Sequence, residues 1–157
     1  MYFLTYMSRA CAHISEEELQ GILENARLKN AEADVTGLLL LRSGTFFQLL
    51  EGKRHDVLAT FARIARDPRH RQIDVLFEFE EEGAKRFFPH WQMGNVDDAR
   101  ASTGQAGLLR SLHGIAASGK PSRVKLLELL RAFSATTPTS AAEILRQVNR
   151  SPRGAEL

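Results

Sequence analysis

The chain of 157 residues is 43% hydrophobic and 25% charged with a formal net charge of +2, the composition of a soluble globular protein with one domain of ordinary size. No apolar stretch approaches the roughly 20 residues that cross a bilayer, and the N-terminus lacks the basic start and long apolar run of a signal peptide, so we expect a cytoplasmic protein without membrane contact. The single cysteine, Cys11, excludes an intrachain disulfide and a cysteine-based zinc site, and the basic C-terminal third lacks the interleaved aromatic residues and reading helix of a nucleic-acid-binding protein.

The first predicted elements are a strand over residues 2–8 and a helix that follows Ser15. Period-two alternation places Tyr6 on one face of this strand with other large side chains. Ser15 and Glu18 have the spacing of a capping box, which is typical of a helix start. The apolar stripe of the helix continues to a polar residue, Asn30, which taken alone is typical of a C-terminal helix residue that the backbone satisfies.

A β-hairpin is predicted over residues 35–52, because two apolar runs flank the tight connection at 42–44. Gln48 lies in the middle of its second strand and shares a face with Phe46 and Leu50. An unpaired amide in such an apolar wall costs roughly 1–3 kcal/mol, so Gln48 must have partners. These partners belong either to the protein or to a ligand.

A second amphipathic helix is predicted from Arg54 to Arg66, where Asp67-Pro68 ends it. The basic residues of this junction are either solvated or able to hold a phosphate; they are Arg63, Arg66, Arg69, His70 and Arg71. Strands are then predicted over 74–80 and 90–94.

The predicted order β-α-β-β-α-β-β indicates an α+β fold, a ferredoxin-like sandwich with both helices on one face of a sheet. We expect one domain over residues 1–97 and a C-terminal helical extension over residues 98–157. The extension is predicted to cover the other face of the sheet with helices near 105–117, 122–134 and 140–149.

No hydrolase triad, metal-ligand spacing, P-loop or dinucleotide-binding glycine pattern is present in the sequence. Instead, Tyr6, Asn30 and Gln48 place hydrogen-bonding groups where core residues are expected. The first and third strands are neighbours in this fold, so Tyr6 and Gln48 are expected to meet above the sheet. A planar ligand between the helices and a buried structural network both explain the three residues.

Five motifs occur in order: LTYMS at 4–8, KNAEADVTGLLLL at 29–41, FFQLLEG at 46–52, IARDPRH at 64–70 and RFFPHWQMG at 86–94. Together they resemble the BLUF family, the blue-light sensors that use FAD. The resemblance covers about residues 1–97 and does not extend to the C-terminal helices.

The resemblance implies a flavin held between the two main helices. Tyr6 matches the photoactive tyrosine, Gln48 the glutamine that bridges this tyrosine to flavin N5 and O4, and Asn30 the asparagine that hydrogen-bonds the O4/N3 edge. The other implied roles are sandwiching of the ring (Ile22 and Ile64), contact with the ribityl phosphate (Arg63), a position near the pyrimidine side (Arg69 and His70) and signal relay (Trp91 and Met93). Lys29 departs from the His or Asn often found before the family asparagine.

The resemblance implies a photoreceptor without catalytic activity of its own. Light would drive electron and proton transfer from Tyr6 and a rearrangement of the Gln48 amide, by rotation or by a tautomer change. We expect the chain to form a homo-oligomer and to regulate a separate signalling protein. The alternatives are a flavin-free scaffold, against which the intact polar residues argue, and an acylphosphatase-type enzyme, for which the segment 8–10 is a poor match.

Overall fold

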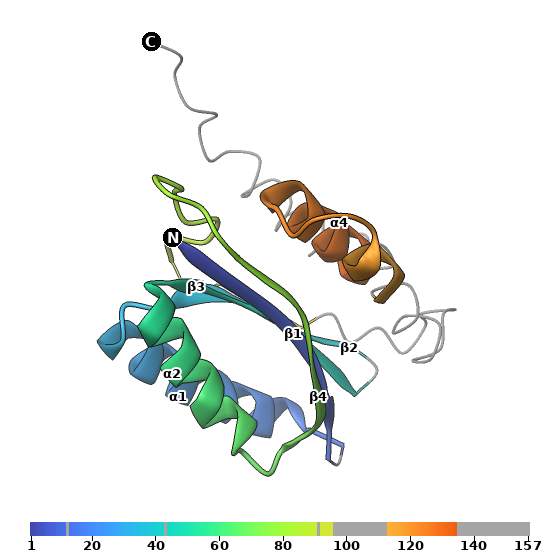
Figure 1. Cartoon of the computed structure of the whole chain (residues 1–157). Helices are drawn as coiled ribbons and strands as arrows, with labels where there is room; N and C mark the ends of the chain where they lie inside the picture. The colour runs from blue at the N-terminus through green and yellow to red at the C-terminus, as the bar shows by residue number, and fades with distance from the viewer. Residues whose placement is uncertain (12, 43, 91, 96–112, 135–157) are drawn as a thin grey trace.

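The structure, a computed structural model, describes residues 1–95 and 113–134 with the exception of 12, 43 and 91. Its elements follow the predicted order β-α-β-β-α-β-β and add a helix of the extension (Figure 1). They are β1 (Tyr2–Ala10), α1 (Glu16–Glu32), β2 (Thr36–Arg42), β3 (Thr45–Gly52), α2 (Arg54–Ala65), β4 (His70–Glu80), β5 (Gln92–Asn95) and α4 (Arg123–Ser134).

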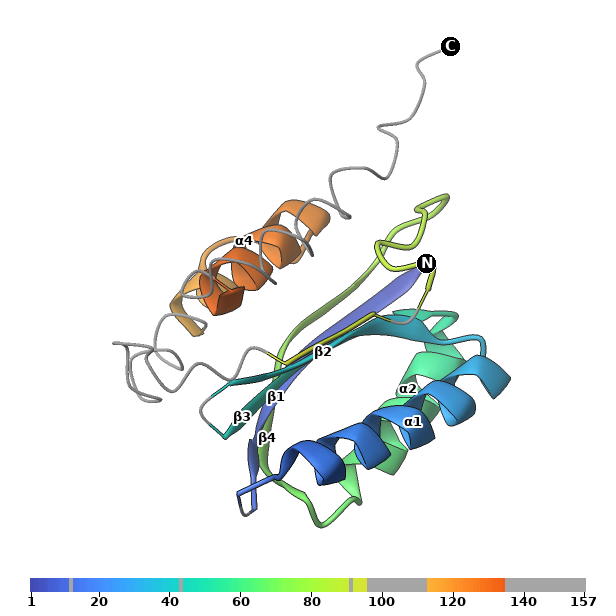
Figure 2. The same ribbon diagram turned by 180° about the vertical axis from the view of Figure 1, so that it is seen from behind.

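The five strands form one sheet in the order β4-β1-β3-β2-β5. All neighbouring strands are antiparallel except β2 and β5, which are parallel. Helices α1 and α2 lie on one face of the sheet and α4 lies on the other, as the two opposite views show (Figure 1 and Figure 2). The predicted α+β sandwich is therefore confirmed.

Helix α1 begins with the predicted capping box. The Ser15 hydroxyl accepts a hydrogen bond from the Glu18 N–H at 3.2 Å, and the Glu18 carboxylate accepts one from the Ser15 N–H at 2.8 Å. The apolar stripe of the helix packs on the sheet through Leu19, Ile22 and Leu23, all buried. This packing holds the first half of α1 against the sheet, and Asn30, which is also buried, lies in its last turn.

The opposite face of the sheet carries the larger hydrophobic cluster. Side chains of the strands, such as Phe3, Phe47 and Leu49, are completely buried there. Leu129 and Leu130 of α4 belong to the same cluster and are also completely buried. The prediction that a helix of the extension covers this face is confirmed for α4.

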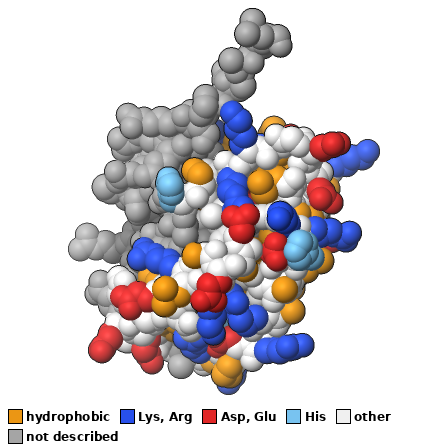
Figure 3. Space-filling view, turned by 90° about the vertical axis from the view of Figure 1, so that its left-hand side faces the viewer, with side chains coloured by type: hydrophobic (Ala, Val, Ile, Leu, Met, Phe, Trp, Pro, Cys, Tyr) orange, Lys and Arg blue, Asp and Glu red, His pale blue; other side chains and the backbone are white. Residues whose placement is uncertain are grey.

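The described surface is mostly polar. On the face shown in Figure 3, acidic and basic side chains are interspersed and hydrophobic ones are scattered. Among the described residues, the large hydrophobic side chains that are exposed are Leu28, Leu58, Val75 and Val124. No helix within the described ranges is long and apolar enough to span a membrane.

Strand β4 begins at His70, four residues earlier than predicted, because its first residues pair with the end of β1 beyond an irregularity in the ladder. Gln72, with φ of 48°, lies in this irregular stretch. Strand β5 covers 92–95 instead of 90–94, and Trp91 lies outside the described residues. Residues 113–117 are helical, whereas the rest of the helix predicted at 105–117 and the helix at 140–149 lie outside the described ranges.

Candidate functional site

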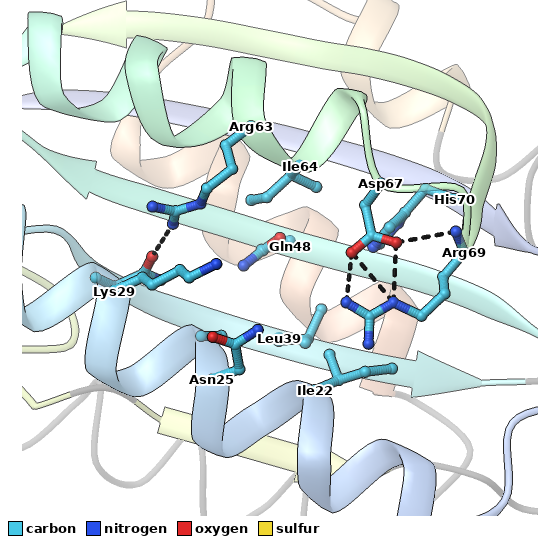
Figure 4. A pocket seen from close by; sticks show the side chains of 12 residues that line it. Ile22, Asn25, Lys29, Leu39, Gln48, Arg63, Ile64, Asp67, Arg69 and His70 are labelled. Carbon is cyan, nitrogen blue, oxygen red and sulfur yellow. Dashed lines mark hydrogen bonds and ion pairs between the residues drawn. The ribbon is translucent and has the colours of Figure 1, made fainter.

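A pocket opens between α1 and α2 above strand β3 (Figure 4). All seven residues predicted to hold a cofactor line it, and both helices, three strands and the turn after α2 contribute to its wall. The lining residues are Ile22, Asn25, Ala26, Lys29, Asn30, Leu39, Gln48, Arg63, Ile64, Asp67, Arg69 and His70.

Gln48 lines this pocket and contacts Tyr6, which is not itself a lining residue. They are directly opposite each other in the β1–β3 ladder, and the Tyr6 hydroxyl donates a hydrogen bond to Oε1 of Gln48. Both residues are buried, with exposed fractions of 0% and 3%. This hydrogen bond turns the amide oxygen of Gln48 toward the phenol. The amide nitrogen then points into the pocket (Figure 4).

The environment of Tyr6 keeps its phenol protonated. Burial raises the pKa of Tyr6 far above its usual value, and the nearby Asp67 carboxylate raises it further. The ring packs against Phe61, with centroids 5.2 Å apart, and lies edge-on to His70 at 6.4 Å. The Tyr6 hydroxyl is therefore a stable hydrogen-bond donor to Gln48 at neutral pH.

Asn30 offers an unused donor within the described residues. Its Oδ1 accepts a hydrogen bond from Nη2 of Arg63 at 2.9 Å, which ties the end of α1 to α2. Its Nδ2 is buried and has no partner in the described part of the chain. A buried donor without an acceptor costs roughly 1–3 kcal/mol, so this amide is expected to donate to a ligand atom.

The turn after α2 forms the other end of the pocket. Arg69 pairs with Asp67, whose carboxylate accepts from the Arg69 Nε at 2.9 Å and from its backbone N–H at 3.0 Å. These hydrogen bonds lower the pKa of Asp67 to about 2. Burial lowers the pKa of His70, whose Nδ1 lies 2.7 Å from the Ser8 hydroxyl oxygen. His70 is therefore neutral near pH 7, and the charges of Asp67 and Arg69 compensate each other.

Apolar side chains form the two long walls of the pocket. Ile22 projects from α1 and Ile64 from α2, with the amide of Gln48 at a level between them (Figure 4). Two aliphatic walls with amide groups at one edge suit a planar ring that carries both hydrogen-bond donors and acceptors. Such a ring would also give the Nδ2 of Asn30 the acceptor it lacks.

The sequence did not single out Asn25, Ala26, Leu39 or Asp67 as lining residues. Asn25 follows Ile22 by one helical turn, so the helical period could have found it. Asp67 was interpreted only as the end of α2, although its carboxylate also raises the pKa of Tyr6. The backbone of Met93 in β5 pairs with pocket residue Leu39 of β2, which places the predicted relay strand next to the pocket wall.

Comparison with known proteins agrees with this geometry. A photoactivated adenylate cyclase subunit beta of Euglena gracilis is 40% identical over 73 residues, which cover 46% of this chain and 8% of that protein. The blue light- and temperature-regulated antirepressor BluF of Escherichia coli (strain K12) is 38% identical over 81 residues, which cover 48% of this chain and 20% of that protein. The chain therefore matches only a small part of the length of either relative.

Among solved structures, the dark state of BlrB, a BLUF protein, is 26% identical with a TM-score of 0.59. That match covers 87% of this chain and 96% of BlrB. A bacterial light-regulated adenylyl cyclase is 31% identical with a TM-score of 0.58 over 80% of this chain and 39% of the cyclase. The family model of sensors of blue light using FAD matches residues 1–94. The chain therefore belongs to the BLUF family, whose cofactor is FAD.

Proposed function

We propose that this chain is a blue-light photoreceptor in which Tyr6 and Gln48 change their hydrogen bonding on illumination. The buried hydrogen bond between the Tyr6 hydroxyl and the Gln48 oxygen, beside a pocket between two helices, carries this proposal. A phenol and a carboxamide in contact offer a chain of donors and acceptors that can be reversed without moving the backbone.

The pocket residues fit FAD. Ile22 and Ile64 would pack against the two faces of its ring, and the free Nδ2 of Asn30 would donate to a ring carbonyl. The amide of Gln48 would contact the same ring, since its nitrogen points into the pocket. Arg63 would contact the ribityl phosphate, and Arg69 and His70 would lie near the pyrimidine side of the ring.

When bound, FAD supplies absorption of blue light and a site that takes up an electron. Tyr6, protonated in the dark, would release an electron and then its proton, and the Gln48 amide in contact with it could accept or pass on that proton. Loss of the phenol proton removes the donor that fixed Gln48, so the amide can rotate or change tautomer. Return of the electron and proton to Tyr6 leaves a different hydrogen-bond pattern until the dark state recovers.

We propose that this change reaches β5 and the extension. Met93 and Trp91 would relay it, because the backbone of β5 lies beside pocket residue Leu39 of β2. We assign the sensor to residues 1–97 and the output to residues 98–157. In this proposal the chain is not itself an enzyme and regulates a separate protein, as a homo-oligomer. The antirepressor among its relatives supports the regulation of a separate protein.

The test is absorption spectroscopy of the FAD-loaded chain in the dark and under blue light. The wild-type chain should show a small, reversible red shift of the flavin band, and Tyr6→Phe and Gln48→Leu should each abolish it. Tyr2→Phe is the matched control, since Tyr2 is also buried on the same face of β1 but donates to Glu78. A normal photocycle in Tyr6→Phe or Gln48→Leu contradicts the proposed roles.

The oligomer is tested by light scattering of the same samples. A mass above that of a single chain in the dark, with a change on illumination that Gln48→Leu abolishes, is the expected result. A single-chain mass under both conditions contradicts the homo-oligomer.

A further inference from the structure

A buried carboxylate lies three residues beyond Gln48 on the same strand. Glu51 has an exposed fraction of 0%, and its position in β3 places it on the face that α4 covers, opposite to Gln48. Removing a charge from water costs several kcal/mol unless it is paired and hydrogen-bonded. A carboxylate at this position therefore needs a full set of partners.

The backbone of the segment before β5 provides these partners. The N–H groups of Phe87 and Phe88 donate to the two oxygens of Glu51 at 2.8 and 2.7 Å. The hydroxyl of Thr36 in β2 donates to Oε1, the oxygen that also accepts from Phe88, at 3.1 Å. Two consecutive backbone groups held by one carboxylate fix both the position and the direction of this segment.

Arg86 adds further contacts to this group of residues. Its guanidinium donates to the Thr36 hydroxyl at 2.8 Å and forms an ion pair with Asp34 at 2.8 Å. The Arg86 side chain is 17% exposed and that of Asp34 is 73% exposed, so solvent screens this ion pair from the Asp34 side. Residues Arg86 to Phe88 are thereby tied to β2 and β3 and not merely packed against them. We call Glu51, Thr36 and these three residues the Glu51 clasp.

Helix α4 rests on the segment that the clasp holds. The rings of Phe87 and Phe88 lie in the same buried cluster as Leu126 and Leu130 of α4. The guanidinium carbon of Arg123, the first residue of α4, lies 3.7 Å from the centroid of the Phe87 ring. Arg123 also donates to the backbone oxygen of Lys85 at 2.8 Å. These contacts hold the N-terminus of α4 against the segment that Glu51 positions.

We propose that Glu51 is a positioning residue that couples strand β3 to helix α4, so that a change at Gln48 reaches the extension through the Glu51 clasp and Arg123. This route rests on the proposed light response of Gln48. It is separate from the relay through β5, because it runs from β3 to α4 through the backbone of Phe87 and Phe88. Because the side chains of Gln48 and Glu51 lie on opposite faces of β3, this route requires that the new hydrogen bonding of Gln48 also shift the strand. Such a shift would move Glu51 together with Gln48, since two residues of one extended strand separate them.

The test is hydrogen–deuterium exchange of the full FAD-loaded chain, in the dark and under blue light, with absorption recorded on the same samples. Glu51→Gln keeps the shape of the side chain but replaces one acceptor oxygen with a donor, so one of the two backbone N–H groups loses its partner. Arg123→Met removes the contacts with Phe87 and Lys85, and a weaker one with the Phe3 ring, from a half-buried helix start. Arg131→Met, the same change at an exposed position of the last turn of α4, is the matched control.

Light should change the exchange rate of α4 in the wild-type chain and in Arg131→Met. In Glu51→Gln and Arg123→Met the flavin red shift should persist while α4 exchanges equally in the dark and in the light. If the clasp had only a structural role, both variants would raise the exchange rate of α4 in the dark and in the light but keep the difference between the two. That result would overturn the proposal. An α4 that does not respond to light in a wild-type chain with a normal red shift also overturns it.

A wild-type chain without any red shift would instead refute the proposed light response itself, so the two failures are distinguishable. If Glu51→Gln does not fold, Arg123→Met carries the same comparison. A light-dependent difference of wild-type size in Arg123→Met then refutes the coupling.

Discussion

Replacing Leu129 with alanine tests whether α4 is part of the folded core. The side chain of Leu129 is completely buried in the cluster that α4 shares with the sheet. Truncation of a buried leucine to alanine costs about 2–5 kcal/mol, because it loses the transfer free energy and leaves a cavity. For a chain of 157 residues, about 3 kcal/mol corresponds to a fall in Tm of roughly 6–12 °C.

The assay is urea unfolding of the full chain, followed by circular dichroism at a fixed FAD concentration, because cofactor binding itself stabilises the folded state. Val124→Ala on the same helix is the control, since Val124 is 67% exposed and its truncation should change the free energy of unfolding by no more than about 0.5 kcal/mol. The reasoning is refuted if Leu129→Ala unfolds at the same urea concentration as Val124→Ala. The extension would then not share the core of the sheet.

Two further predictions concern the pocket. Asn30→Ala removes the Nδ2 donor and the oxygen that accepts from Arg63, so the affinity for FAD should fall about 5- to 150-fold. Fluorescence titration measures this affinity, and an unchanged value would contradict the role of Asn30. Asp67 has its pKa lowered from 3.8 to about 2, so its ion pair stabilises the fold above pH 3.8 and is lost as the pH falls through 2. Because this pair is partly exposed, Asp67→Asn should remove at most about 1 kcal/mol of acid-dependent stability between these pH values, and acid unfolding identical to the wild type would argue against the pairing.

The position of the pocket could be predicted because it depends on short-range periodicity. Alternation along two strands grouped Tyr6 and Gln48 with the large side chains of one face of each strand, and the helical period placed Ile22 and Asn30 on one stripe of α1. These patterns also fixed the order of elements. The pairing of Tyr6 with Gln48 then followed from the neighbouring positions of β1 and β3 in a ferredoxin-like sheet.

The buried charges could not be predicted in the same way. Arg42 and Glu51 lie at strand ends, where charged residues are usually solvated, yet both are buried. The backbone N–H donors of Glu51 come from a segment more than 30 residues later, and no local pattern connects the two. The start of β4 at His70 was missed for a related reason. Its charged first residues join the sheet only through pairing with the end of β1.

The central claim is that the hydrogen bond between Tyr6 and Gln48 is the light-sensitive element of this BLUF protein. The most direct measurement is the light-minus-dark infrared difference spectrum of the FAD-loaded chain, with the side-chain amide of glutamine labelled with ¹⁵N. The account predicts a labelled amide band that shifts on illumination, together with the red shift, and is absent in Tyr6→Phe and Gln48→Leu. An identical band in Gln48→Leu, or a red shift without any labelled band, would contradict it.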